Sequence, residues 1–339
     1  MRKMVNHAII GCGRVAQNHV NAANQNGMKI KFCCDLDLEK AKAFAEKNKI
    51  ERYSDNYLDI LADDEIDSVS ICTDHKSHTE IAEKLVNKKH LIIEKPFSVN
   101  QEKAQEFIKL IDGSKIVSVI AQHRFDKVVN FIKQLLEDKA LGEVTLFNAN
   151  LNCYRDLGYY ADSYWRGTLE KEGGSTIINQ SFHIVDTLVY LFGIPKEIKT
   201  FKNNFTFKNV IDTEDTCVSI VRYDNFLGTL SSTNTSITDW ETDIKIIGTK
   251  GNVSFNIDFP EEIIEINLAD DLKEKYARDL EEIKNNYQKN LKEPANYYGL
   301  SHISQFENFK NAIINDEHLK VGVKEALETQ KVIDMIYRG

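Results

Sequence analysis

The sequence predicts an α/β fold in two domains: an N-terminal doubly wound parallel sheet and a C-terminal α+β domain with a large, mostly antiparallel open sheet. Three observations lead to this prediction. Short apolar runs alternate with helical patterns up to about residue 121, which favours parallel strands with helices on both faces. A glycine motif follows the first apolar run. Beyond residue 122, strands with period-two alternation dominate, which favours antiparallel pairing.

The first part of the chain, residues 1–121, alternates strands and helices in a regular order. Strands are expected at 5–10, 28–37, 66–73, 90–96 and 115–122, and helices at about 12–26, 38–48, 78–89 and 100–112. Helices of roughly ten to fifteen residues suit right-handed crossovers between parallel strands. Ligands of such sheets bind in the crevice at the carboxyl ends of the strands.

The remaining residues, 122–339, are expected to form the second domain. A helix is predicted from His123, and strands follow at 145–155, 197–205, 216–224, 226–236, 242–249 and 251–258. A domain of this kind usually carries the substrate site at the cleft beside the nucleotide-binding domain. The charged segment 270–290 is predicted to be a solvated or partner-covered helix. Two amphipathic helices near the C-terminus are expected to pack back on the fold.

Composition excludes several classes of function. The chain has 339 residues and a formal net charge of −9, and no Lys/Arg cluster of the kind that neutralises phosphate backbones. Nucleic acid and anionic membranes are therefore not expected as partners, whereas small solutes are. The six cysteines show no metal-ligand spacing, and no apolar run is long enough to span a membrane. We therefore expect a cytoplasmic protein without a metal site.

The glycine motif predicts a dinucleotide site of the Rossmann type. Gly11, Gly13 and Ala16 form G-x-G-x-x-A between a strand and a helix, where the turn, the approach of a pyrophosphate and the close helix packing need small residues. Asp35 ends the second strand, where a carboxylate accepts the ribose hydroxyls. The same carboxylate would repel a 2′-phosphate, so NAD is predicted rather than NADP. Asp37 is the nearby competitor for this role.

The stretch LIIEKPF, residues 91–97, runs three aliphatic residues into Glu94, Lys95 and Pro96. One interpretation is a strand that simply meets solvent. The other follows from parallel-sheet geometry, which places the end of this strand in the ligand crevice. Lys95 is then a candidate catalytic group that faces His183, and Pro96 fixes the direction of its side chain, with a cis peptide bond as one means.

A long apolar helix is predicted at 173–193, and polar residues interrupt it. Asn179 and His183 are four positions apart, and His183 and Asp186 are three apart, so one helical face can hold all of them. A core histidine satisfied by its neighbours is the alternative. Several aligned polar groups on a buried helix are costly without partners, which favours a functional site.

These motifs together resemble the Gfo/Idh/MocA oxidoreductases. The similarity rests on GCGRVAQNH, SICTDHKSHTEIAEKLVNKKHLIIEKP, AQHR, SYWRGTLEKEGGSTIINQSFHIVD and IIGTKGNV, which span nearly the whole chain. The resemblance implies that Lys95 lies beside the nicotinamide and the substrate hydroxyl, and that His183 is the proton-transfer partner. It implies cofactor contacts from Gly11, Gly13, Arg14, Val15, Asp35, Thr73, His78, Glu94, Lys95, Gln122, Trp165 and Arg166.

Two positions depart from the family pattern. Many members have Asp where this chain has Asn179, and an Asn side chain cannot take a proton. Proton transfer would therefore fall to His183 or Lys95, and Asn179 would orient a neighbouring hydroxyl. The usual Thr-Pro after the third strand is Thr73-Asp74 here. The sequence offers no explanation for Asp74.

Within the family, the chain is most similar to the UDP-N-acetylglucosaminuronate 3-dehydrogenases, on segments that include ANYYGLSHISQFENFKNAI. This similarity implies hydride transfer from a sugar ring carbon to NAD, in the synthesis of cell-surface polysaccharide sugars. Dehydrogenases of inositol or other free sugars are an alternative, as is a glycosidase that uses NAD transiently. An NAD-binding redox sensor without turnover belongs to a different class. Homodimers or homotetramers through the C-terminal sheet are expected.

Overall fold

The structure is a computed structural model that describes residues 4–258, 260–290 and 299–339. The chain divides into two compact units: unit 1 comprises Met1–Gln122 and Tyr298–Gln330, and unit 2 comprises His123–Tyr297 and Lys331–Gly339. The helix α11 (Gly299–Asn315) thus groups with the N-terminal sheet. The expected boundary between residues 121 and 122 stays a prediction. Residues 295–298 of the ANYYGL motif lie outside the described residues.

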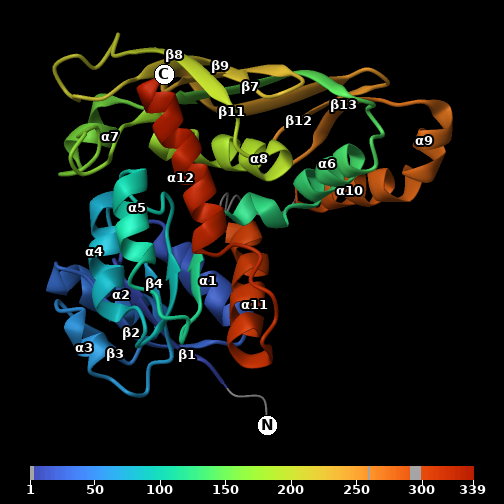
Figure 1. Ribbon diagram of the computed structural model, residues 1–339. Coiled ribbons are helices and arrows are strands. Elements are labelled where there is room, and N and C mark those ends of the chain that lie inside the picture. Colours follow the sequence, from blue (N-terminus) through green and yellow to red (C-terminus); the bar gives the residue numbers. More distant parts are fainter. Residues whose placement is uncertain (1–3, 259, 291–298) are drawn as a thin grey trace. The chain divides into compact units, whose positions relative to one another are not determined.

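Unit 1 contains a parallel sheet in the order β3-β2-β1-β4-β5-β6 (Figure 1). Its strands are β1 (Asn6–Ile10), β2 (Lys29–Cys34), β3 (Arg52–Ser54), β4 (Ser68–Ile71), β5 (His90–Ile93) and β6 (Val117–Val119). Every adjacent pair is parallel, so the predicted doubly wound sheet is confirmed. The strand β3 was not expected, because three residues are too few to show a period.

Helices cover both faces of this sheet. One face packs against α1 (Ala16–Gln25), α2 (Leu38–Asn48) and α11. The other packs against α3 (Leu58–Leu61), α4 (His75–Leu85), α5 (Gln101–Ile108) and the start of α12 (Val323–Arg338). Neighbouring residues of one strand alternate between the two cores, as Ile9 and Ile10 do. The sheet is therefore buried on both sides, which explains its nearly continuous apolar strands.

Asp74 has a local structural role that the sequence did not reveal. It is the N-cap of α4, and its carboxylate accepts the backbone N–H of Ser77 at 3.2 Å and the hydroxyl of Ser77 at 2.7 Å. Side chains at this position satisfy N–H groups that a helix start leaves without partners. The departure from Thr-Pro thus supplies a helix cap at the edge of the sheet.

Unit 2 contains a sheet in the order β13-β12-β11-β7-β10-β9-β8. Its strands are β7 (Val144–Tyr154), β8 (Glu197–Asn203), β9 (Thr216–Arg222), β10 (Leu227–Thr233), β11 (Thr235–Gly248), β12 (Asn252–Phe255) and β13 (Ile263–Asn267). All pairs are antiparallel except β10 with β7. The predicted second sheet is confirmed, with β13 as an additional strand.

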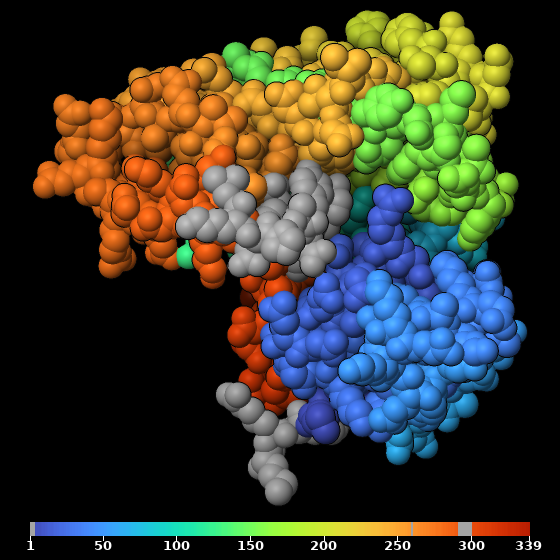
Figure 2. All heavy atoms as spheres, turned by 180° about the vertical axis from the view of Figure 1, so that it is seen from behind, coloured from blue at the N-terminus to red at the C-terminus, as the bar shows by residue number. Residues whose placement is uncertain are grey.

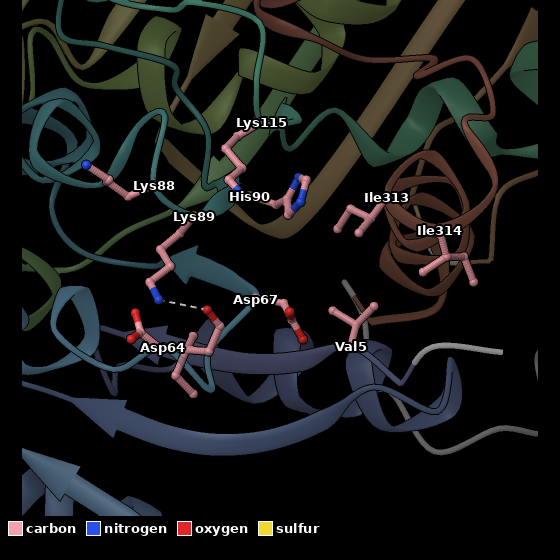
Figure 3. A pocket seen from close by; sticks show the side chains of 10 residues that line it. Val5, Asp64, Asp67, Lys88, Lys89, His90, Lys115, Ile313 and Ile314 are labelled. Atoms are coloured by element: carbon pink, nitrogen blue, oxygen red, sulfur yellow. Dashed lines mark hydrogen bonds between the residues drawn. The ribbon is translucent and has the colours of Figure 1, made fainter. Parts of the chain in front are cut away.

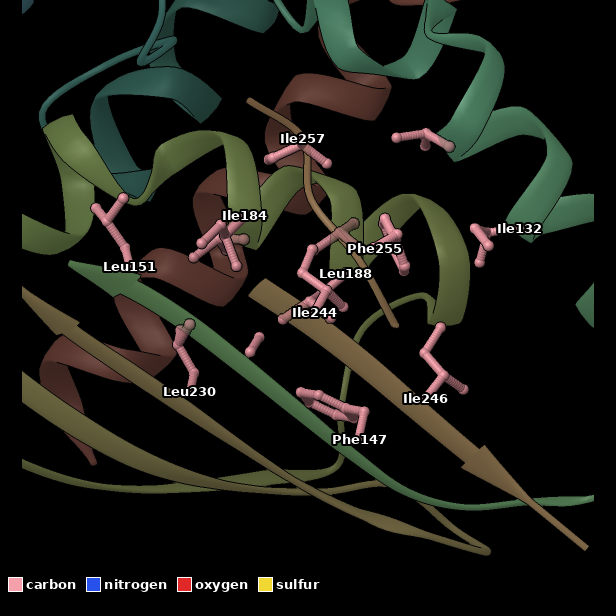
Figure 4. Close-up of a cluster of buried hydrophobic side chains, with 14 of the residues drawn as sticks. Ile132, Phe147, Leu151, Ile184, Leu188, Leu230, Ile244, Ile246, Phe255 and Ile257 are labelled. Carbon is pink, nitrogen blue, oxygen red and sulfur yellow. The ribbon is translucent and has the colours of Figure 1, made fainter. Parts of the chain in front are cut away.

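One face of this sheet packs on helices. Side chains of the strands, such as Phe147 and Ile244, meet Ile184 and Leu188 of α8 (Phe182–Phe192) and Ile132 of α6 (Lys127–Glu137) in one apolar core (Figure 4). The short helix α7 (Leu157–Ala161) follows β7. This core fixes α8, which carries His183, against a rigid sheet.

The charged segment forms two helices, α9 (Asp270–Lys275) and α10 (Ala277–Asn290). Figure 2 shows them in orange on the surface of unit 2. Within the segment, only Tyr276 and Ile283 are buried, so most of it is exposed in this chain, as either a solvated or a partner-covered segment would be. Among the described residues, no helix is long and apolar enough to cross a membrane.

Candidate active site

The strand register of unit 1 brings the predicted cofactor residues to one edge of the sheet. Ile10 is paired with Cys34 and with Ile71, and Ile71 is paired with Ile93. The next residues of these strands therefore line the carboxyl edge together; they are Gly11, Asp35, Cys72 and Glu94. This is the edge at which parallel sheets bind ligands.

Glycine is needed at the two positions of the motif for different structural reasons. Gly11 has φ 88°, and a Cβ atom there would lie 2.6 Å from the carbonyl oxygen of Cys72. Only glycine fits this turn. A Cβ at Gly13 would meet no heavy atom within 4 Å, so the space in front of this backbone is open. Arg14 is exposed and Val15 half-buried at the start of α1. This open cradle at a helix N-terminus fits a pyrophosphate.

Asp35 is held in place by three contacts. Its Oδ2 accepts the backbone N–H of Cys12 at 2.8 Å and the ammonium of Lys40 at 2.7 Å, and its Oδ1 accepts the N–H of Asp37 at 3.1 Å. Asp37 itself caps α2. Asp37, the alternative candidate for binding the ribose, therefore serves as a helix cap. The carboxylate of Asp35 is instead fixed beside the glycine turn.

The peptide bond between Lys95 and Pro96 is cis. The carbonyl of Pro96 lies 2.8 Å from Nδ1 of His78, and the carbonyl of Thr73 lies 3.2 Å from Nε2. Burial lowers the pKa of His78 most, although these carbonyls act in the opposite direction. A neutral imidazole donates one N–H, and the shorter contact is the better hydrogen bond. His78 thus ties the Lys95-Pro96 loop to α4.

Glu94 is a buried carboxylate at the centre of a polar cluster. Its Oε1 lies 2.9 Å from Nε2 of His19 and 3.4 Å from Nε2 of His302, and its Oε2 accepts the backbone N–H of Lys95 at 3.0 Å. Burial alone would raise the pKa of Glu94, but the hydrogen bonds with His19 and His302 hold it well below its usual range. Glu94 therefore anchors the main chain of Lys95.

A chain of hydrogen bonds continues from His19 away from Glu94, and only one assignment of donors and acceptors satisfies it with neutral imidazole rings. Because His19 Nε2–H donates to Glu94, a neutral ring must accept at Nδ1 from the hydroxyl of Ser70, 2.8 Å away. Ser70 then accepts from Nε2–H of His7 at 2.7 Å, and Nδ1 of His7 accepts from the hydroxyl of Ser68 at 2.8 Å. Burial lowers the pKa of His7 to about 3, which agrees with a neutral ring.

Sequence reasoning missed His19 and His302 as members of this site. His19 stands in GCGRVAQNH, three positions after Ala16, and this position on the buried face of α1 was the available signal. His302 comes from α11, and nothing local linked it to Glu94. The three ligand atoms lie within 4.8 Å of one another, a spacing open to a metal ion. The assignment of donors and acceptors accounts for the His19–Glu94 contact without one.

A polar cavity of about 240 Å³ lies at the opposite edge of the unit 1 sheet (Figure 3). Residues at the amino ends of the strands line it, including Val5, Asp67 and His90. Lys89 donates to the carbonyl oxygen of Ile66 at 2.8 Å. The cavity is therefore separate from the edge that carries Gly11 and Glu94.

In unit 2 the predicted single helix at 173–193 is wrong. The π-helix η2 (Thr176–Gln180) comes first, and α8 begins only at Phe182. The physical reason is that side chains satisfy the first N–H groups: Glu214 Oε1 lies 3.1 Å from the N–H of both Ser175 and Ile177. Asn179 therefore does not share an α-helical face with His183.

Asn179 instead pairs with a carboxylate that sequence reasoning did not single out. Its Nδ2 donates to Glu172 Oε1 at 2.6 Å and lies 3.4 Å from the hydroxyl of Tyr159. Glu172 is fully buried and also accepts the backbone N–H of Gly167. The guanidinium of Arg166 lies 4.3 Å from the ring centre of Tyr159. Asn179 and Arg166 thus meet around one tyrosine.

Asp186 and His183 have separate partners. The carboxylate of Asp186 forms a buried bidentate ion pair with Arg124, at 2.8 to 3.2 Å. The ring of His183 contacts the ring of His123 edge-on, with centroids 4.8 Å apart. Both partners belong to the 3₁₀ helix η1 (Gln122–Phe125). Its first residue, Gln122, is buried. The roles predicted for the individual site residues, including Trp165, stay predictions.

Comparisons with known proteins agree with this fold. Residues 5–122 match the oxidoreductase family with an NAD-binding Rossmann fold, and residues 129–254 match the GFO/IDH/MocA C-terminal domain. The dehydrogenase WlbA from Chromobacterium violaceum, crystallised with NADH and UDP-GlcNAcA, superposes with a TM-score of 0.88. The two chains are 26% identical, over 100% of this chain and 94% of the other.

Two further proteins are similar at lower or comparable identity. WlbA from Bordetella pertussis, in complex with NADH and UDP-GlcNAcA, has a TM-score of 0.86 and is 23% identical, over 99% of this chain and 95% of the other. The scyllo-inositol 2-dehydrogenase (NADP(+)) IolU of Bacillus subtilis is 26% identical over 79% of this chain and 80% of its own length. The similarities thus include dehydrogenases with different substrates and cofactors.

Proposed function

This chain belongs to the Gfo/Idh/MocA oxidoreductase family, and from this premise we propose that it oxidises C3 of a UDP-sugar uronate with NAD. The observation that carries the proposal is the alignment at the carboxyl edge of the unit 1 sheet. There the glycine cradle, the fixed carboxylate of Asp35 and the Glu94–Lys95 pair lie on neighbouring strands. If LIIEKPF were only a strand that ends in solvent, this combination of groups on one sheet edge would not be needed.

The residues at this edge fit a dinucleotide. Gly13 leaves open space for a pyrophosphate at the start of α1, and Asp35 has its carboxylate fixed at the end of β2. Other proposed contacts come from the predicted residues Arg14, Val15 and Thr73. NAD, when bound, accepts a hydride from the substrate carbon.

The chain supplies the proton chemistry and the charge. As the C–H bond breaks, the attached hydroxyl must lose its proton, and in our proposal the imidazole of His183 accepts it. The ammonium of Lys95 stabilises the negative charge that develops on the same oxygen. Asn179, fixed by Glu172, orients a neighbouring hydroxyl. His183 is buried, which limits competing contact with water.

The nucleotide-sugar substrate is supported by the two WlbA structures, both of which are complexes with NADH and UDP-GlcNAcA. The guanidinium of Arg166 beside Tyr159 offers planar donors suited to a carboxylate. A second candidate is an inositol or free-sugar dehydrogenase, favoured by the similarity to IolU. An NAD-binding sensor without turnover has no need of Asn179 fixed by the buried Glu172 or of a lysine anchored by Glu94.

The decisive experiment is a substrate screen with the purified full-length chain. UDP-sugar uronates, neutral UDP-sugars, inositols and free sugars are each supplied with NAD, and NADH formation is followed by absorbance. We expect turnover with a UDP-sugar uronate. Activity confined to inositols would replace the nucleotide-sugar proposal with the second candidate, and NADH binding without turnover of any substrate would favour the sensor.

We also propose that the protein self-associates through the outer face of the unit 2 sheet. The strand β9 buries Cys217, Ser219 and Val221, whereas Val218 and Ile220 are about half exposed, at 47% and 53%. Phe201 on β8 is 83% exposed. Exposed apolar residues on one sheet face are typical of protein interfaces. Sedimentation analysis should show a dimer or tetramer, and a monomer would refute this proposal.

A cytoplasmic location is proposed from the cysteines. All six, including Cys33 and Cys34, are buried free thiols, as expected in a reducing compartment. Fractionation of cells that express the tagged chain would test this location.

A further inference from the structure

A second imidazole lies against His183. The ring of His123 contacts the ring of His183 at 4.8 Å between centroids, with an angle of 78° between the planes. Both rings belong to unit 2, and they come from η1 and α8. The edge of one ring therefore meets the face of the other, so a charge on His123 acts on His183 at short range.

His123 is paired with a buried carboxylate. Its Nδ1 lies 2.5 Å from Oδ2 of Asp126. Asp126 stands at the N-cap of α6, yet its side chain does not cap that helix, because it is directed to His123. Burial by itself lowers the pKa of His123, but Asp126, Glu261 and Asp258 outweigh burial and raise it. The contact with Asp126 thus favours the protonated form of His123.

The other charged groups near this pair come from η1, α8 and the segment that follows β12. Arg124 of η1 and Asp186 of α8 neutralise each other in their bidentate pair. Asp258 and Glu261, which follow β12, act on His123, and burial raises the pKa of Glu261 to about 7. His123, paired with Asp126, is therefore the residue of this group whose protonated ring acts directly on His183.

We propose that His123, held as an imidazolium by Asp126, is a positioning residue that keeps the adjacent His183 uncharged and able to accept the substrate proton. Two imidazolium rings in edge contact repel each other, so protonation of His183 is disfavoured while His123 is charged. This inference rests on the proposed role of His183 as the base. It assigns to AQHR, residues 121–124, a function that the glycine and Lys95 motifs do not cover.

Histidine NMR on the full-length protein without substrate tests the inference directly. In wild-type protein at pH 7, the two ring nitrogens of His123 should both be protonated and the ring of His183 neutral. In H123Q the titration midpoint of His183 should rise by about one pH unit, because the cation is lost while Asp126, Asp258 and Glu261 remain. His318→Gln, at an exposed site in unit 1, should leave the midpoint unchanged.

A pH profile separates this role from a purely structural one. In H123Q the acid limb of kcat/KM should move to higher pH by the same interval, while activity on the alkaline plateau stays within a few-fold of wild type. A neutral His123 in wild-type protein at pH 7, or an unmoved His183 midpoint in folded H123Q, would overturn the inference. Absence of turnover with every substrate would count against the proposed function instead, since the NMR titration needs no substrate.

Discussion

His19 Nε2 lies 2.9 Å from Glu94 Oε1, and both side chains are buried between the unit 1 sheet and α11. Burial of a carboxylate is costly unless donors satisfy it. Here His19, His302 and the N–H of Lys95 provide those donors. The ionised form of Glu94 is therefore preferred in the folded protein, and the position of the Lys95 main chain depends on a group far away in the sequence.

The depressed pKa of Glu94 predicts a specific loss of stability in acid. A carboxyl whose folded pKa lies below its unfolded value of about 4.3 stabilises the fold above that pH, and this stability is lost as the pH falls further. Urea unfolding of wild-type protein between pH 3 and pH 7 should show this loss. Glu94→Gln should have a lower free energy of unfolding at pH 7 and a flatter dependence below about pH 4.5.

The same titration has an internal check. His7 and His19 also have lowered pKa values because of burial, and such groups cost stability as the pH falls through their unfolded value of about 6.5. The loss of unfolding free energy at about pH 6.5 should therefore be the same in Glu94→Gln as in wild type. A variant curve parallel to wild type at every pH would contradict the role given to Glu94.

The two glycines of the motif predict opposite phenotypes. Gly11→Ala places a Cβ 2.6 Å from the Cys72 carbonyl at a positive φ, so the free energy of unfolding should fall by about 1–3 kcal/mol. Gly13→Ala meets no atom of the protein and should fold normally. Its methyl group occupies the proposed pyrophosphate space, so NADH affinity should fall at least about tenfold. Thermal unfolding and fluorescence titration measure the two effects.

These phenotypes reflect what the sequence could predict. Gly11, Asp35 and Lys95 were recognisable because each follows a strand directly or by one residue, and parallel strands place such residues at one edge. His302 was not, since its contact with Glu94 joins positions more than two hundred residues apart. The π-helix at Thr176–Gln180 was missed because the side chain that accepts N–H groups at its start, Glu214, is also remote in the sequence. The periodicity of apolar residues predicts where helices and strands lie, whereas hydrogen bonds from residues remote in the sequence can change an α-helix into a π-helix.

The contacts of Asp35 predict how cofactor preference can be changed. In Asp35→Asn the negative charge is removed and the ammonium of Lys40, now 2.7 Å from that carboxylate, becomes available to a 2′-phosphate. We expect NADPH affinity to rise by about tenfold, which is about 1.4 kcal/mol, relative to NADH. Fluorescence titration with both reduced cofactors checks this result. The double variant with Lys40→Met should lose the gain; tighter NADPH than NADH binding by wild type would refute the Asp35 argument.

Lys95 and His183 should be needed for turnover and not for cofactor binding. Lys95→Met and His183→Ala are each expected to lower kcat by about a hundredfold or more, with NADH affinity within a few-fold of wild type. His90→Gln, at the opposite edge of the sheet, is the matched control and should keep its activity. Full turnover in Lys95→Met or His183→Ala would remove that residue from the mechanism.

The pairing of Asn179 with Glu172 predicts that an aspartate at this position would make the stability of this chain depend on pH. Their side chains are 2.6 Å apart, and Glu172 is fully buried, so two carboxylates at that distance cannot both be ionised. In Asn179→Asp the pair therefore holds a proton, and its folded pKa lies above the unfolded value. The contribution to stability is then present at low pH and lost as the pH rises, so the variant should be less stable by about 1–3 kcal/mol at pH 8 than at pH 5, relative to wild type.

A compensating change tests the physical cause of this effect. In the double variant Glu172→Gln with Asn179→Asp, the new amide can donate to the introduced carboxylate while its oxygen accepts the N–H of Gly167, as Glu172 does now. The hydrogen bond is restored with the charge on the opposite partner. Urea unfolding at pH 8 should therefore recover most of the lost free energy. If Asn179→Asp is as stable at pH 8 as at pH 5, the two side chains do not interact as the structure implies.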